Sequence, residues 1–206
     1  MGCTCNAETK ERTRPNRSHE NKAKETEIEI KPKESSSSFD KTKCQSLTET
    51  LPKRTSTNLP SLKDIIKSKT GPLSELERSY IIFLWICQNI DYDYEGLVAG
   101  RDIDCSPQGV FQNGKTVCSG YSRLYKDIGK YIGLNVECVN CYAKGIGYQP
   151  GQKLTSTNHE YNVINLDNKW YPIDATWGAG HIENNKYIKQ YNEFYFLAIN
   201  QDSFSR

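Results

Sequence analysis

The chain has 206 residues, with 27 Lys and Arg against 25 Asp and Glu, and a formal net charge of +2. This length is enough for one domain with its own core, and the charge is too small to predict nucleic-acid binding by itself. No apolar run reaches the roughly 18 residues that cross a bilayer, and the first residues, MGCTCNAETK, lack the apolar region of a secretory signal. We therefore expect a cytoplasmic protein whose eight cysteines are not paired in disulfides.

The first 58 residues are predicted to form a disordered tail. They hold 12 Lys and Arg against 9 Asp and Glu, the run SSSSF, and almost no aliphatic side chains. Such a segment buries too little apolar surface to offset its chain entropy. We therefore predict a basic tail over residues 1–58 and a folded domain over residues 59–206.

Three helical segments are predicted at the start of this domain. The first covers residues 59–70, with Ser61 as its N-cap. The second follows Ser74, which forms a capping box with Glu77 and precedes apolar residues at helical spacing. The third is one turn over SPQGVFQNG, begun by Ser106.

A longer helix and a set of strands follow. The segment GKTVCSGYSRLYKDIGKYIG has apolar side chains on one helical face, and Gly133 is its natural end. Helices followed by antiparallel strands indicate an α+β fold. The strands are predicted from β-branched and aromatic residues, with a hairpin turn at Asp167-Asn168, and they cover residues 135–143, 160–166, 169–174 and 193–199.

Cys118 lies at the expected N-terminus of the longer helix. Free amide groups and the positive end of the helix dipole favour a thiolate there, and the small neighbours Ser119 and Gly120 leave room for a substrate. Taken alone, Cys118 could be a packing residue, a metal ligand, half of a disulfide or a nucleophile. A nucleophilic thiol needs a base, and the base needs an orienting partner.

His159 and Asp174 are the candidates for that base and its partner. His159 starts one predicted strand, and Asp174 ends the next. A hairpin that turns at residues 167–168 brings residue 159 within two positions of residue 174 across the ladder. A carboxylate placed there can orient an imidazole. His19 lies in the tail, and we expect His181, after the run GAG, to be a surface histidine.

Three segments carry a family resemblance: FLWICQNIDYDYEG, VCSGYSRLYKDIGKYIGLNVECV and NHEYNVINLDNKWYPIDATWGAG. They resemble the transglutaminase-like superfamily and, within it, the kyphoscoliosis peptidase and hillarin group. The resemblance covers about residues 73–200. It implies a papain-like or transglutaminase-like core in which Cys118 is the nucleophile, His159 the base and Asp174 its orienting partner.

The chemistry implied by this resemblance is acyl transfer on protein substrates through a thioester, to water or to a lysine amine. Cytoskeletal proteins are among the implied partners. A catalytically inactive scaffold of the same fold is the alternative. The sequence has no D-x-D-x-D-G loop, and we expect no required metal or cofactor.

Two features depart from the superfamily pattern. Tyr161 stands two residues after the histidine, where the superfamily usually has Trp, and the sequence ends at Arg206, where that group continues into further β-rich domains. The chain is therefore expected to be a fragment, a short paralogue or a truncated gene model. Oxyanion stabilisation needs donors, for which the Cys118 N–H and the Gln108 side chain are the candidates, whereas Trp85 is expected to lie in the core.

Cys138 and Cys141 form a lone CxxC pair on a predicted strand. Residues three apart on a strand point to opposite faces, and no second pair of ligands has zinc-site spacing. We therefore expect structural thiols. A zinc-binding module remains the weakest alternative for the chain.

The N-terminus predicts a lipid anchor. Gly2 follows the initiator Met, Cys3 and Cys5 are candidate palmitoylation sites, and Asn6 stands where a myristoylation motif prefers Ser or Thr. Six basic and two acidic residues between Lys10 and Lys24 supply a basic patch that would strengthen binding to the inner membrane face.

Overall fold

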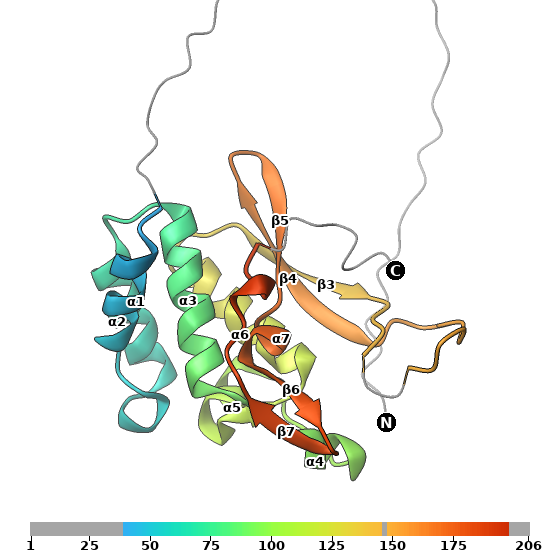
Figure 1. Ribbon diagram of the computed structural model, residues 1–206. Coiled ribbons are helices and arrows are strands. Elements are labelled where there is room, and N and C mark those ends of the chain that lie inside the picture. Colours follow the sequence, from blue (N-terminus) through green and yellow to red (C-terminus); the bar gives the residue numbers. More distant parts are fainter. Residues whose placement is uncertain (1–38, 146–147, 198–206) are drawn as a thin grey trace, which may run out of the picture. The chain divides into compact units, whose positions relative to one another are not determined.

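The computed structural model describes residues 39–145 and 148–197 (Figure 1). The α-helices are α1 (Lys41–Glu49), α2 (Leu59–Thr70), α3 (Glu75–Asn89), α4 (Tyr94–Val98), α5 (Pro107–Asn113), α6 (Cys118–Tyr131) and α7 (Ala175–Ala179). The strands are β1 (Asp91–Tyr92), β2 (Lys115–Thr116), β3 (Val136–Cys141), β4 (His159–Leu166), β5 (Lys169–Ile173), β6 (Gly180–Glu183) and β7 (Lys186–Lys189). Two 3-10 turns, η1 (Arg54–Ser56) and η2 (Glu193–Tyr195), complete the described elements.

Helices lie on one side of the domain and an antiparallel sheet on the other. The sheet has the order β3-β4-β5, and α6 packs against both β3 and β4 (Figure 1). On its other side α6 contacts α3, which also contacts α1 and α7. The α+β fold predicted from the sequence is therefore confirmed.

Helix α3 forms the centre of the core. Every residue from Tyr80 to Cys87 is buried, because apolar side chains surround the whole helix and it can be stable only inside the domain. Its start is fixed by the predicted capping box, in which Ser74 and Glu77 bond each other's backbone and side chain. The helical turn after Ser106 is also present, as α5.

The domain begins before residue 59, which corrects part of the predicted tail. Helix α1 is capped by Asp40 and buries Cys44, and Leu51 after it is only 6% exposed. Phe39 makes an edge-to-face ring contact with Tyr80. A few apolar residues at the right spacing are enough to dock this segment, although its average composition is that of a disordered chain.

Three further expectations are corrected. The N-cap of α2 is Asn58, whose side chain accepts a hydrogen bond from the Ser61 N–H, so Ser61 lies inside the helix. Residues 193–197 form η2 and one isolated bridge between Ile173 and Phe196 in place of a strand, while residues 198 and 199 lie outside the described residues. The hairpin β6–β7 had not been predicted, although Asn184-Asn185 at its turn is a recognised signal.

The hairpin β4–β5 turns where the sequence predicted. Asp167 and Asn168 both have positive φ, as a two-residue turn requires, and Leu166 pairs with Lys169. Helix α6 also ends as predicted, with Gly133 at a positive φ.

The expected lipidation sites, Gly2, Cys3 and Cys5, lie outside the described residues, and the anchor therefore stays a prediction. Within residues 39–145 and 148–197, none of the helices has both the length and the apolar character that crossing a membrane requires.

Leu51→Ala tests whether the segment before residue 59 belongs to the domain. We expect the free energy of unfolding to fall by about 2–5 kcal/mol, because the substitution removes buried methyl groups and leaves a cavity. Ser46→Ala, at an exposed position of α1, is the control and should change little. Equal stabilities of the two variants in chemical denaturation would show that the segment is not docked.

Candidate active site

Cys118 is the first residue of α6, held at the end of a short parallel strand pair. Strand β2 leads directly into the helix and pairs with β1, so that Tyr92 lies opposite Thr116. The N-cap residue, Val117, makes no side-chain capping bond. The first N–H groups of the helix, which have no partner within it, are therefore directed at the Cys118 region.

Gly120 has a packing role, which corrects the expectation that it opens space for a substrate. A Cβ added there would come within 2.0 Å of Thr116 Oγ1. Because Gly120 has no side chain, α6 can approach β2 closely, and this close packing sets the position of Cys118 relative to β1.

His159 and Asp174 meet as the hairpin predicted. His159 is the first residue of β4, and Asp174 immediately follows β5. The His159 Nε2 atom lies 2.6 Å from Asp174 Oδ2. Asp174 is fully buried, and its second oxygen, Oδ1, accepts a hydrogen bond of 3.0 Å from the Trp177 N–H as the N-cap of α7. The two carboxylate oxygens therefore have separate tasks, one capping a helix and the other orienting the imidazole.

Trp177 was missed by the sequence analysis. Its ring stacks on the His159 ring with centroids 4.7 Å apart and planes 14° apart. The stack shields one face of the imidazole, while Asp174 fixes its edge. The signal in the sequence was the spacing, because an Asp three residues before Trp177 is the pattern of an N-capped helical turn.

The electrostatics of Cys118 favour a thiolate. Burial alone would raise the pKa of the thiol, but its hydrogen bond with His159, the charge of His159 and the backbone N–H groups of Glu160 and Ser119 together lower the pKa below the ordinary 9.0. Since Asp174 occupies Nε2, the nitrogen left for the sulfur is Nδ1.

His159 responds in the opposite direction. Burial alone would lower its pKa, but the hydrogen bonds to Asp174 and Cys118 and their negative charges raise the pKa of His159 from 6.5 to about 10. Because the pKa of the thiol lies below that of the imidazole, a thiolate–imidazolium pair is favoured over a neutral thiol and a neutral imidazole.

The other described thiols behave differently. Burial is the leading cause that raises the pKa values of all five, which are Cys44, Cys87, Cys105, Cys138 and Cys141. Cys118 is thus the one thiol among the described cysteines with a lowered pKa.

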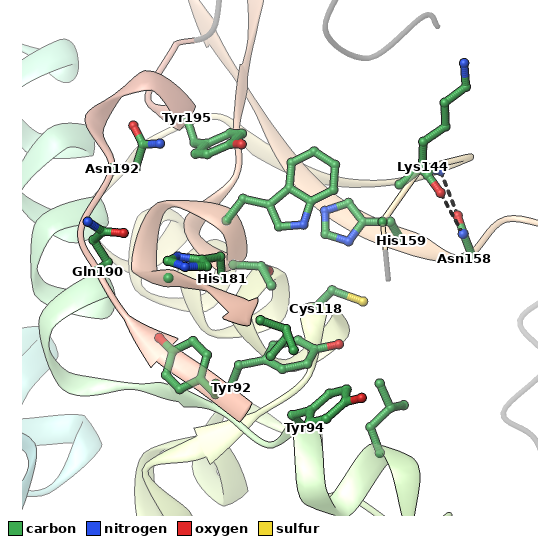
Figure 2. Close-up of a pocket in the computed structure, with 18 of the residues that line it drawn as sticks. Tyr92, Tyr94, Cys118, Lys144, Asn158, His159, His181, Gln190, Asn192 and Tyr195 are labelled. Atoms are coloured by element: carbon green, nitrogen blue, oxygen red, sulfur yellow. Dashed lines mark hydrogen bonds between the residues drawn. The ribbon is translucent and has the colours of Figure 1, made fainter. Parts of the chain in front are cut away.

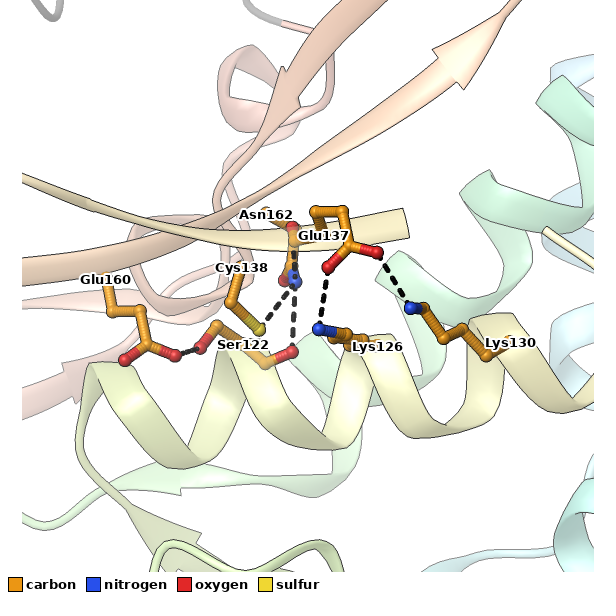
Figure 3. A network of polar contacts seen from close by, with 7 residues as sticks. All are labelled: Ser122, Lys126, Lys130, Glu137, Cys138, Glu160 and Asn162. Carbon is orange, nitrogen blue, oxygen red and sulfur yellow. Dashed lines mark hydrogen bonds and ion pairs between the residues drawn. The ribbon is translucent and has the colours of Figure 1, made fainter. Parts of the chain in front are cut away.

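A polar network fastens the strand of His159 to the helix of Cys118 (Figure 3). The Ser122 hydroxyl of α6 donates to the buried carboxylate of Glu160 on β4. Asn162, also on β4, donates to the Ser122 carbonyl at 2.9 Å. Further along α6, Lys126 and Lys130 each lie 2.7 Å from Glu137 on β3. These bonds resist separation of His159 from Cys118.

Cys118 and His159 open into a cavity of about 950 Å³ (Figure 2). Tyr92 also lines this cavity. Burial, followed in size by the negative charge of a thiolate at Cys118, raises the pKa of the Tyr92 hydroxyl. This hydroxyl therefore stays protonated and can donate a hydrogen bond. Gln108, the candidate from the sequence, is exposed on α5 and does not line the cavity. Trp85 is buried as predicted and donates to the Pro52 carbonyl at 3.0 Å.

The remaining candidates take other positions. Cys138 faces Asn162 at 3.7 Å and Cys141 lines the cavity, so the two thiols point to opposite faces of β3 as predicted. Among the described residues, no three His, Cys, Asp or Glu side chains are grouped so that they could hold a metal ion. His181 is exposed, as predicted, but it lies on β6 and lines the cavity.

The fold and the site define an α+β domain in which a helix-borne thiol meets a strand-borne histidine and a buried carboxylate. The profile of the Transglutaminase-like superfamily (Transglut_core) matches residues 62–175. The chain belongs to this superfamily.

Two curated relatives and one solved structure show how far the similarity reaches. The chain is 36% identical over 128 residues to the kyphoscoliosis peptidase of Mus musculus and 35% identical over 131 residues to that of Homo sapiens, which is 61% of this chain and 19% of each relative. It therefore spans about a fifth of the length of these relatives. A crystal structure of a TGase matches with a TM-score of 0.44 and 19% identity, covering 75% of this chain and 37% of that chain.

Iodoacetamide labelling tests the electrostatics of the site. At pH 7 we expect Cys118 to be alkylated faster than the five other described thiols, because the thiolate is the reacting form. His159→Ala should remove this selectivity, since it removes the imidazolium that stabilises the thiolate. Cys138→Ala is the control and should leave the Cys118 rate unchanged. Equal labelling of all six thiols in wild type, read by peptide mass spectrometry, would contradict the assignment.

Asp174→Asn isolates the charge of the carboxylate, because Asn can still cap α7. Loss of this charge lowers the pKa of His159 and thereby raises the pKa of Cys118, so the alkylation–pH profile should move to higher pH. For each pH unit by which the midpoint of this profile rises, the alkylation rate of Cys118 below the midpoint falls about tenfold. Asp40→Asn makes the same change at the N-cap of α1 and should not move the profile. An unmoved midpoint in Asp174→Asn would show that the carboxylate does not set the protonation of the pair.

Proposed function

We propose that this domain is a cysteine peptidase or acyltransferase that acts on protein substrates through Cys118, His159 and Asp174. The observation that carries the proposal is the buried His159, which is bonded to Asp174 at one nitrogen and faces the thiol with the other. The arrangement supports acyl transfer because it combines an activated nucleophile, a base and an orienting carboxylate.

In the first half-reaction the Cys118 thiolate attacks the carbonyl carbon of a carboxamide or peptide bond. The negative oxygen that forms would be stabilised by the Cys118 N–H, at the free end of α6, and by the Tyr92 hydroxyl. The imidazolium of His159 gives its proton to the departing nitrogen as the C–N bond breaks. The products of this step are a thioester on Cys118 and a free amine or ammonia.

In the second half-reaction His159 acts as a base. It removes a proton from water or from a primary amine, which attacks the thioester carbon and releases the Cys118 sulfur. Water gives hydrolysis, whereas a lysine amine gives a crosslink. Asp174 holds the imidazole in one orientation in both halves and stabilises its positive charge.

We further propose cytoskeletal proteins among the substrates, in keeping with the sequence-based expectation. An N-terminus acylated at Gly2, Cys3 and Cys5 would hold the domain at the inner membrane face.

The proposed reaction is tested by mass spectrometry of protein-derived peptides incubated in ¹⁸O-water with a labelled primary amine. We expect wild type to insert ¹⁸O at new C-termini or at deamidated Gln, or to attach the amine. Cys118→Ala should do none of these, because it lacks the nucleophile. Cys138→Ala, which removes a thiol with a raised pKa, should behave as wild type. No difference between wild type and Cys118→Ala would contradict the proposal and favour a non-catalytic scaffold.

A further inference from the structure

The cavity above Cys118 has two unlike walls. One wall is built by α4 and the hairpin β6–β7, and the other by the segment that follows β3. Figure 2 shows Tyr94 of α4 and Lys144 of that segment on opposite sides of Cys118. A polypeptide that presents its carboxamide to Cys118 therefore meets both walls.

The wall on the α4 side presents aliphatic side chains, together with His181, and is already assembled. Leu97 and Val98 are 49% and 68% exposed and line the cavity, which Ile182 of β6 also lines. The Tyr94 hydroxyl donates to the Asn185 side chain at 3.2 Å, which ties α4 to the turn of the hairpin. When an apolar side chain of a ligand covers exposed aliphatic side chains, apolar surface is removed from water and the free energy falls.

The opposite wall carries a positive charge at its rim. Asn158 holds the segment by two hydrogen bonds to Ala143, at 2.7 Å to its N–H and 2.8 Å to its carbonyl. Lys144 follows at the rim, where its Nζ atom lies 5.6 Å from the centroid of the half-buried Tyr148 ring. The described residues that line the cavity include Lys144 and two histidines but no Asp or Glu.

We propose that this site takes a polypeptide segment with a bulky apolar side chain on one side of the reacting carboxamide and an acidic side chain on the other. The apolar side chain covers Leu97 and Val98, and the carboxylate pairs with Lys144. This inference rests on the proposed acyl-transfer function and adds the class of substrate. A basic side chain near Lys144 is disfavoured, since no carboxylate of the described wall would balance it.

The test uses short peptides whose central residue carries a chloroacetamide on its side chain. The Cys118 sulfur forms a bond to the methylene carbon and chloride leaves, so the rate of adduct formation reports recognition without any turnover. In two parent peptides, Leu and Glu flank the central residue in one order or the other. In further peptides Ser replaces the Leu, or Lys replaces the Glu. Each rate is divided by the iodoacetamide rate of the same variant, which cancels differences in thiolate content.

We expect the faster of the two Leu/Glu peptides to form its adduct about tenfold faster, or more, than the peptide in which Ser replaces its Leu, as for other apolar subsites. Replacing Glu by Lys should slow the reaction by about 2- to 5-fold, the range of an exposed ion pair. Lys144→Glu should reverse the preference between Glu and Lys, and Val98→Asp should reduce the preference for Leu. Lys153→Glu and Ala99→Asp make the same changes at exposed positions that do not line the cavity, and they should leave both preferences unchanged.

The outcomes separate this inference from the proposed function. If iodoacetamide labels Cys118 selectively but the rate of adduct formation does not depend on the peptide sequence, the proposed substrate class alone is overturned. Preferences that Lys144→Glu and Val98→Asp leave unchanged would overturn it as well. Unselective iodoacetamide labelling would instead overturn the proposed function on which it rests.

Discussion

The hydrogen bond between His159 and Asp174 is the interaction on which the rest of this domain depends. It is 2.6 Å long, and Asp174 is fully buried beneath it. An unpaired carboxylate in that position would be costly, so the fold surrounds this one with donors. The Trp177 N–H donates to its other oxygen. The backbone of Asp174 is held separately, because its N–H donates to the Tyr195 carbonyl.

The elements around this bond together bring His159 to the Cys118 thiol. The hairpin β4–β5 presents His159 and Asp174 from neighbouring strands. The parallel pair β1–β2 sets the start of α6, and with it Cys118. The bonds from Ser122 to Glu160 and from Asn162 to Ser122 join these two parts. A thiol with a lowered pKa and a histidine with a raised pKa are the electrostatic result.

Local signals in the sequence predicted the parts of the fold that depend on local chemistry. The turn Asp167-Asn168 fixed the register of the hairpin, and the register was enough to expect the contact between His159 and Asp174. The capping box of Ser74 and the apolar periodicity of α3 predicted the central helix in the same way.

The parts that depend on distant contacts could not be predicted as well. Helix α1 has the composition of a disordered tail, and it is ordered by docking Cys44 onto the core. The ring of Trp177 reaches His159 only because α7 turns back after Asp174. The cavity walls from α4 and from β6–β7 meet across long stretches of chain, which no local pattern encodes.

The protonation state of His159 tests the central claim most directly. In protein labelled with ¹⁵N at histidine, the His159 ring signals can be assigned by their loss in His159→Ala and followed against pH. The account predicts that the ring is an imidazolium at pH 8, with a titration midpoint near 10, and that Cys118→Ala lowers this midpoint because the thiolate is gone. A neutral His159 ring at pH 8, with a midpoint at or below 6.5, would contradict the thiolate–imidazolium pair.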